Sequence, residues 1–139
     1  LPSTAGELTL PALLRSGPLV LAFYTEDSTP LCSSEVSMLA ADFNVIEDLG
    51  ASVVAVSSDS LESHREFAAR LGGVPFPLAS DLSLEVARLY GVADEAGGRC
   101  RRAVFVIGRD GRIVHAEPWF QPGNPAQYEA VFRALGFSG

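Results

Sequence analysis

The apolar residues of this chain alternate between two kinds of run. Pro18–Tyr24 and Ser52–Ser57 are stretches rich in apolar β-formers, a pattern typical of strands that are buried on both faces in a parallel sheet. Each stretch is followed by apolar residues at the three- and four-residue spacing of an amphipathic helix. The first helix carries its stripe over Cys32–Ile46 and ends before Gly50, and the second spans Leu61–Leu71. The first half therefore predicts the order β-α-β-α.

The second half predicts a short apolar piece, a helix, a hairpin and a final helix. The piece is Phe76–Ala79, and the helix that follows it runs from about Leu82 to Tyr90. Arg102–Ile107 and Arg112–Ala116 flank an Asp-Gly step, which favours a hairpin turn. In the final helix the inward-facing residues are Tyr128, Val131, Phe132 and Leu135.

This order of elements is that of the thioredoxin fold, by analogy at the level of topology. We therefore expect an α/β fold with a central mixed sheet flanked by helices, in which Phe76–Gly91 is an insertion. A length of 139 residues allows one domain, 1–139, and leaves no room for a second.

Charge and composition exclude several classes of function. The chain has 17 acidic and 10 basic residues, a net charge of −7, which disfavours nucleic acids and anionic membrane surfaces as partners. Its apolar runs are far shorter than the roughly 18 residues that cross a bilayer. No signal peptide is visible, and the start at Leu1 without a Met suggests a trimmed chain. Because two cysteines do not make a disulfide framework, we expect a reducing, cytoplasmic location.

The clearest candidate for chemistry is Cys32. The pattern places Thr29 at the N-cap of the first helix, Pro30 at its first position and Cys32 in its first turn. A thiolate is the reactive form of cysteine, and unpaired amides at a helix N-terminus favour negative charge. Cys32 also lies on the apolar stripe, where a buried, unreactive thiol is equally common. Position alone leaves both interpretations open.

Four segments together resemble the peroxiredoxin family, and most closely its bacterioferritin comigratory protein-like group. They are Tyr24-Thr-Glu-Asp-Ser-Thr29-Pro-Leu-Cys32-Ser-Ser-Glu35, Phe76-Pro-Leu-Ala-Ser-Asp81, Tyr90-Gly-Val92 and Arg102-Ala-Val-Phe105. The resemblance covers nearly the whole chain. It departs from the family at Thr25, where the signature has Pro, and in lacking the usual opening strand before Leu1, which is consistent with either a shortened chain or a reduced N-terminal hairpin.

The resemblance implies a thiol-dependent peroxidase, an antioxidant oxidoreductase that reduces hydrogen peroxide or organic hydroperoxides. It assigns Cys32 as the peroxidatic nucleophile, Arg102 as the group that stabilises the thiolate and binds peroxide, and Thr29 as a hydrogen-bond donor. Glu35 would orient the arginine, although by itself it reads as an exposed acid near the helix start. No cofactor is implied. No metal is implied either, because the two histidines are not at ligand spacing with the cysteines.

The sequence does not identify the thiol that resolves Cys32. A resolving cysteine five residues after Cys32 is absent, because Ser37 occupies that position. Cys100 is the only other cysteine in the chain. Either Cys100 or an external thiol, from a thioredoxin-like protein or a low-molecular-weight thiol, would resolve Cys32. The family resemblance also allows a homodimer. The alternative function is a non-catalytic thioredoxin-fold module that binds a partner or senses oxidation, and Thr25 is its main support.

Overall fold

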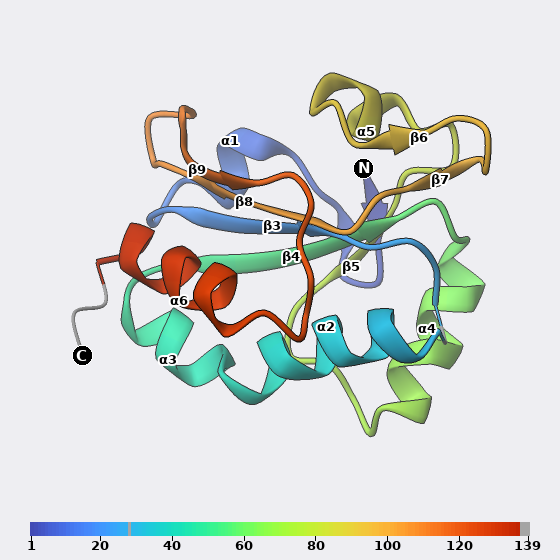
Figure 1. The fold of residues 1–139 in the computed structure, drawn as a ribbon, viewed down its shortest axis with the longest axis horizontal. Helices are drawn as coiled ribbons and strands as arrows, with labels where there is room; N and C mark the ends of the chain where they lie inside the picture. The colour runs from blue at the N-terminus through green and yellow to red at the C-terminus, as the bar shows by residue number, and fades with distance from the viewer. Residues whose placement is uncertain (28, 137–139) are drawn as a thin grey trace.

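A mixed sheet of seven strands organises the molecule, in the order β2-β1-β5-β4-β3-β8-β9 (Figure 1). The computed structural model describes residues 1–27 and 29–136. The three strands β3, β4 and β5 run parallel, while β1 and β8 close this group on either side as antiparallel neighbours. The expected mixed sheet flanked by helices is therefore confirmed.

The strands and helices have the following bounds. The strands are β1 (Pro2–Ser3), β2 (Gly6–Glu7), β3 (Leu19–Phe23), β4 (Ser52–Ser57), β5 (Leu78–Ser80), β6 (Ala93–Asp94), β7 (Arg99–Cys100), β8 (Ala103–Ile107) and β9 (Ile113–Glu117). The helices are α1 (Leu10–Leu13), α2 (Pro30–Ala41), α3 (Phe43–Asp48), α4 (Leu61–Arg70), α5 (Glu85–Leu89) and α6 (Pro125–Ala134). No helix among the described residues is long and apolar enough to span a bilayer.

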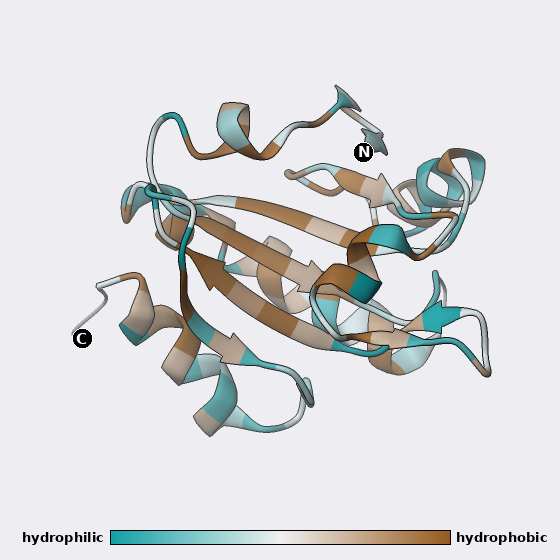
Figure 2. Ribbon diagram, turned by 90° about the horizontal axis from the view of Figure 1, so that it is seen from above, coloured by the Kyte–Doolittle hydropathy of each residue, from teal (hydrophilic) through white to brown (hydrophobic). Residues whose placement is uncertain are grey.

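The central strands separate two hydrophobic cores. Side chains alternate along β3, so Val20 and Ala22 enter the core beneath α2, α3, α4 and α6, which we call the lower core. Leu19, Leu21 and Phe23 enter the core beneath α1 and α5, which we call the upper core. Figure 1 shows the two helix groups on opposite sides of the sheet, and Figure 2 shows that the central strands carry mostly hydrophobic residues. Burial on both faces explains the unbroken apolar runs of the sequence.

The prediction of a single helix between the first two strands is wrong, because two helices, α2 and α3, occupy this segment. It breaks at Asp42, whose backbone (φ −100°, ψ 9°) ends α2 and begins α3. The Tyr128 hydroxyl of α6 donates a hydrogen bond to Asp42 Oδ2 at 2.7 Å and lies 3.2 Å from the Met38 carbonyl oxygen. The break thus coincides with a tertiary contact that apolar spacing alone does not encode.

The segment after β4 differs from the prediction in two respects. Leu78–Ser80 is not part of an insertion but forms β5, which pairs in parallel with β4. The helix predicted from about Leu82 begins only at Glu85, because Leu84 has left-handed backbone geometry (φ 61°). The Asp81 carboxylate accepts hydrogen bonds from the first amides of this helix, including that of Ala87 at 2.8 Å.

The apolar spacing of the sequence predicted neither of two short hairpins. The pair β1–β2 lies at the edge of the sheet beside β5, which agrees with a reduced N-terminal hairpin, one of the two alternatives that the sequence left open. The pair β6–β7 aligns Ala93 with Cys100 and Asp94 with Arg99. Two-residue strands are too short to produce a periodic pattern, so apolar spacing could not reveal them.

Candidate active site

The loop between β3 and α2 delivers the candidate cysteine. Thr29 has an extended backbone (φ −79°, ψ 147°), Pro30 opens the helix, and Cys32 occupies its first turn. These positions are those predicted from the sequence. The Thr29 side chain makes no capping hydrogen bond, however, and its hydroxyl instead donates to the Glu26 carbonyl oxygen at 3.4 Å. Thr29 therefore marks the start of the helix through its backbone and leaves the first-turn amides uncapped.

Cys32 is fully buried in the lower core, next to the apolar stripe of α2. Cys32 thus packs as a small apolar residue and also lies at a helix N-terminus, so its surroundings agree with both interpretations. The first intrahelical bond runs from the Ser33 amide to the Thr29 carbonyl at 2.8 Å. The amide of Cys32 precedes that bond and belongs to the unpaired donors of the first turn.

Glu35 is also fully buried, so its interpretation as an exposed acid is wrong. Neither carboxylate oxygen has a hydrogen-bond partner among the described residues. Burial raises the pKa of Glu35 well above its ordinary value, the neighbouring Cys32 raises it further, and the positive charge of Arg102 acts in the opposite direction. The structure therefore places Cys32 and Arg102 each within electrostatic range of Glu35.

Arg102 connects this group to a cavity. The residue immediately precedes β8 and is half-buried, and its Nε atom is buried without a hydrogen-bond partner among the described residues. The cavity that it lines has a volume of about 210 Å³. The full lining consists of Thr25, Asp94, Cys100, Arg101, Arg102, Trp119, Phe120 and Gln121. Thr25, the residue that replaces the signature Pro, thus lies at this cavity.

Cys100 lines the same cavity as Arg102. Its thiol is nevertheless buried in the upper core, whereas Cys32 lies in the lower core. Both cysteines are free. Burial raises the pKa of Cys100 to about 12, with smaller contributions from the charges of Asp81 and Asp59. Cys100 is therefore held as a neutral thiol across the physiological pH range.

A buried polar network near the cysteine was missed in the sequence. The Tyr24 hydroxyl donates to Asp27 Oδ1 at 2.6 Å, and His64 Nδ1 lies 2.9 Å from Asp27 Oδ2. His64 is fully buried, and its Nε2 lies 2.9 Å from the Ala79 carbonyl oxygen. Both ring nitrogens of His64 therefore have a hydrogen-bond partner. The sequence carried one signal of this network: His64 lies on the apolar face of α4, and a buried histidine needs a hydrogen-bond partner.

The network determines the protonation state of Asp27. Burial opposes the charged carboxylate, but hydrogen bonds from His64, Tyr24 and Ser63 outweigh it, and together they lower the pKa of Asp27. Burial and the Asp27 charge raise the pKa of Tyr24, which stays protonated. This Asp27–His64 pair fixes the loop that leads to the first turn of α2, because Asp27 belongs to that loop and His64 to α4.

Asp27, Asp59 and His64 are also the one group of possible metal-ligating side chains found among the described residues, with their ligand atoms within 4.8 Å of one another. Their atoms are already engaged, since Asp59 Oδ2 accepts hydrogen bonds from the Asp27 amide at 2.8 Å and from the Ser57 hydroxyl at 2.7 Å. We therefore describe the group as a hydrogen-bond network that holds the loop.

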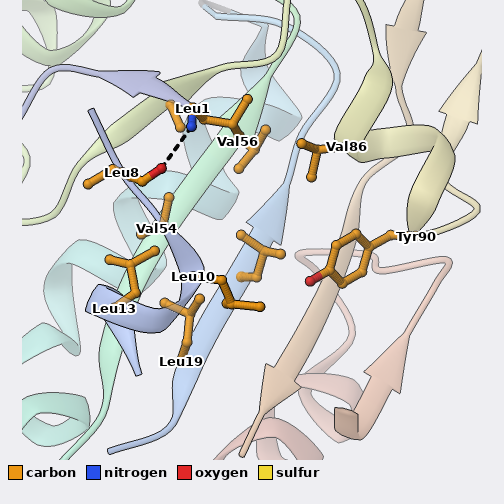
Figure 3. Close-up of a pocket in the computed structure, with 11 residues that line it drawn as sticks. Leu1, Leu8, Leu10, Leu13, Leu19, Val54, Val56, Val86 and Tyr90 are labelled. Carbon is orange, nitrogen blue, oxygen red and sulfur yellow. Dashed lines mark hydrogen bonds between the residues drawn. The ribbon is translucent and has the colours of Figure 1, made fainter. Parts of the chain in front are cut away.

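A second cavity lies on the other face of the sheet, away from Cys32 (Figure 3). Its volume is about 180 Å³, and its walls are aliphatic apart from Tyr90. It is enclosed by the N-terminal segment, by β3 and β4, and by α5. Tyr90 supplies the one polar side-chain atom among the described residues that line this cavity.

Comparisons with known proteins agree with this geometry. The profile of the AhpC/TSA family matches residues 1–116. The chain belongs to the AhpC/TSA family of peroxiredoxins. It is 34% identical over 127 residues to peroxiredoxin Bcp of Xanthomonas campestris, an alignment that covers 84% of this chain and 75% of that protein. It is 35% identical over 102 residues to a putative peroxiredoxin, YkuU, of Bacillus subtilis, covering 69% of this chain and 57% of the relative.

Solved structures of peroxiredoxins share the fold. Peroxidoxin BcpB from Mycobacterium tuberculosis superposes with a TM-score of 0.87 at 28% identity, covering 98% of this chain and 90% of that one. The bacterioferritin comigratory protein of Xanthomonas campestris gives 0.79 at 30% identity, covering 98% and 89%. The thioredoxin-like fold and the likeness to the bacterioferritin comigratory protein group are thus confirmed. The chain spans about half the length of the first curated relatives that it matches.

Proposed function

We propose that this peroxiredoxin is a thiol peroxidase that reduces hydrogen peroxide or small organic hydroperoxides through Cys32. The observation that carries the proposal is the buried Glu35, whose pKa responds both to the first-turn Cys32 and to the charge of Arg102. A partly buried guanidinium is stabilised by a nearby anion, and we assign a thiolate at Cys32 as that anion.

The proposed reaction is a displacement at oxygen. The Cys32 sulfur attacks the terminal oxygen of the hydroperoxide, and the S–O bond forms while the O–O bond breaks. The sulfur is oxidised to the sulfenate, and the leaving oxygen departs as an alcohol or water with the proton that the attacked oxygen gives up. Arg102, the Thr29 hydroxyl and the Cys32 amide are the donors we assign to the charge that develops on oxygen.

Glu35 has a protonation role in this scheme. Burial and a charged Cys32 both raise the pKa of Glu35, so a thiolate at Cys32 favours the neutral carboxyl group. A neutral Glu35 leaves the charge of Arg102 available to the thiolate and the peroxide. We assign Glu35 as a positioning residue beside Arg102 that does not compete for its charge.

An external thiol is the proposed resolving agent. It attacks the sulfenic sulfur, water leaves, and a mixed disulfide forms, which a second thiol reduces. The separate cores of the two cysteines and the raised pKa of Cys100 support an external resolver over Cys100. A thioredoxin-like protein or a low-molecular-weight thiol would serve. The two free thiols also support a reducing location such as the cytoplasm, and the resemblance supports a homodimer.

The decisive experiment is stopped-flow measurement of hydrogen peroxide consumption by fully reduced protein, with Cys32→Ser as the test variant. We expect Cys32→Ser to lose all but trace activity and to keep its fold, since serine preserves the helix start but supplies no thiolate. Cys100 remains in this variant and serves as the internal thiol control. Wild-type protein that reacts no faster than free cysteine would instead support the non-catalytic module.

A further inference from the structure

Arg101 and Arg102 present two positive charges to one cavity without a matching pair of acids. Neither forms an ion pair among the described residues, whereas Arg88, Arg99 and Arg133 each pair with a glutamate. The Nε atoms of both cavity arginines are buried and lack hydrogen-bond partners among those residues. Such donors are costly to leave unmatched. Because the proposed function assigns the Cys32 thiolate to Arg102, Arg101 is the cation of this wall that still lacks an acidic partner among the described residues.

Arg101 is held in place by Trp119. Its Cζ atom lies 3.8 Å from the centroid of the indole ring, and its Nη2 donates to the Pro118 carbonyl oxygen at 3.5 Å. A guanidinium stacked on an aromatic face has a fixed donor plane. The Trp119 side chain remains 66% exposed. The cavity therefore combines an oriented cation with uncovered apolar surface.

The segment that carries Trp119 is anchored to the site. The Phe120 amide donates to the Arg102 carbonyl oxygen at 3.0 Å, and the Gln127 side-chain amide donates to the Trp119 carbonyl oxygen at 3.0 Å. The Gln121 amide in turn donates to Gln127 Oε1 at 2.7 Å. These bonds fix the backbone that carries Trp119 relative to Arg102.

The lining selects the class of anion. A guanidinium fork matches a carboxylate with two parallel hydrogen bonds. Asp94, also on the wall, reduces the net charge of the lining to one positive unit, which disfavours dianions such as phosphate monoesters. Trp119 and Phe120 supply apolar contact for a short carbon chain. A volume of about 210 Å³ suits a small monocarboxylate.

We propose that this cavity is a carboxylate-binding site, in which Arg101 and Trp119 make the enzyme prefer small hydroperoxy acids over neutral hydroperoxides. The carboxylate binds at Arg101, and the peroxide group lies toward Arg102, which the cavity shares with the Cys32 group. The inference deepens the proposed peroxidase function and rests on it for the substrate, while carboxylate binding is measurable without turnover.

Binding is tested with reduced protein and two isosteric probes, pentanoate and pentanamide. Trp119 is the only tryptophan in the chain, so its fluorescence reports the cavity directly. We expect pentanoate to change the emission in a saturable manner and pentanamide to bind at least tenfold more weakly. Arg101→Met should abolish the difference. Arg112→Met removes the same charge from an exposed residue outside the cavity and should leave the difference intact. Equal binding of both probes to wild type would overturn the proposal.

Selectivity is tested by comparing kcat/KM for 5-hydroperoxypentanoic acid and its methyl ester. We expect the acid to react about tenfold faster than the ester in wild type, which corresponds to about 1.4 kcal/mol. The ratio should fall to about one in Arg101→Met and stay near its wild-type value in Arg112→Met. Trp119→Leu keeps the charge of Arg101 but removes its stacking surface, and this variant should give an intermediate ratio. It supplies a second test of the site in case Arg101→Met does not fold.

The two hypotheses fail in different ways. If hydrogen peroxide is not consumed but pentanoate still binds at Trp119, the peroxidase function is wrong and the carboxylate site stands. If hydrogen peroxide is consumed rapidly and the ratio of acid to ester is one in wild type, the carboxylate site is wrong and the peroxidase stands.

Discussion

Glu35 illustrates what can be learned at the scale of a single residue. The sequence offered two interpretations of it, an exposed acid or a partner of the arginine, and spacing could not choose because Glu35 adjoins the apolar stripe of α2. Burial decides, since a carboxyl group with no exposed surface and no hydrogen-bond partner among the described residues cannot be a solvated acid. Cys32, Thr29 and Arg102, in contrast, were assigned from the motif alone.

Glu35→Gln should retain most of the peroxidase activity at neutral pH, within about threefold of wild type, a difference below 1 kcal/mol. Glutamine reproduces the neutral carboxyl group that the raised pKa implies. Steady-state peroxide consumption checks this expectation. A loss of a hundredfold or more would show that the ionised carboxylate is required.

The same variant should be more stable than wild type at neutral pH. A raised carboxyl pKa in the folded state means that the stabilising contribution is complete below the ordinary value of 4.5 and is lost as the pH rises toward the folded-state pKa. The free energy of unfolding of Glu35→Gln should lack this decline. Urea unfolding at several pH values measures it, and parallel profiles for the two proteins would contradict the assignment.

At the scale of elements, the chain's apolar periods located the main strands and helices but not their junctions. The break at Asp42 depends on a hydroxyl from α6, and the late start of α5 depends on the Asp81 carboxylate. Both are contacts between residues distant in sequence or outside the periodic pattern. The loop before α2 belongs to this scale as well, because His64 of α4 holds it through Asp27.

Asp27→Asn should destabilise the protein by about 2–3 kcal/mol at neutral pH, the usual effect of losing a buried charge-assisted hydrogen bond. The lowered pKa of Asp27 means that its contribution is present above the ordinary value of 3.8 and disappears as the pH falls below it. The variant should therefore show a flatter acid limb in its stability profile.

Asp48→Asn is the matched control, because Asp48 is exposed and belongs to no part of the network. It should change the free energy of unfolding by less than about 0.5 kcal/mol. Peroxide consumption by Asp27→Asn should also slow, since the loop that it releases leads to Cys32. Full activity with reduced stability would separate the network from the positioning of the cysteine.

At the scale of the whole molecule, the sheet lies between the two thiols. An intramolecular disulfide needs Cα atoms within about 7 Å, so joining Cys32 to Cys100 would require the first turn of α2 or the β6–β7 hairpin to move. The sequence identified Cys100 as a candidate resolving thiol but could not show on which side of the sheet its sulfur is buried.

Reduced protein treated with one equivalent of peroxide should therefore yield sulfenic acid on Cys32, or a mixed disulfide when an external thiol is present. Cys100→Ser should turn over at the wild-type rate. Peptide mapping by mass spectrometry after alkylation distinguishes these products. A linked peptide containing both cysteines, together with slow turnover of Cys100→Ser, would make Cys100 the resolving residue.

The partition of the interior by the sheet has a consequence for how the chain can diverge. Substitutions in the two cores share few direct contacts, so their effects on the free energy of unfolding should be additive. Leu39→Ala beneath α2 and Leu84→Ala in the upper core should together cost the sum of their separate losses within about 0.5 kcal/mol. The upper core is thus free to accumulate changes under selection for stability alone, while the lower core, which also surrounds the reactive sulfur, is constrained by chemistry as well.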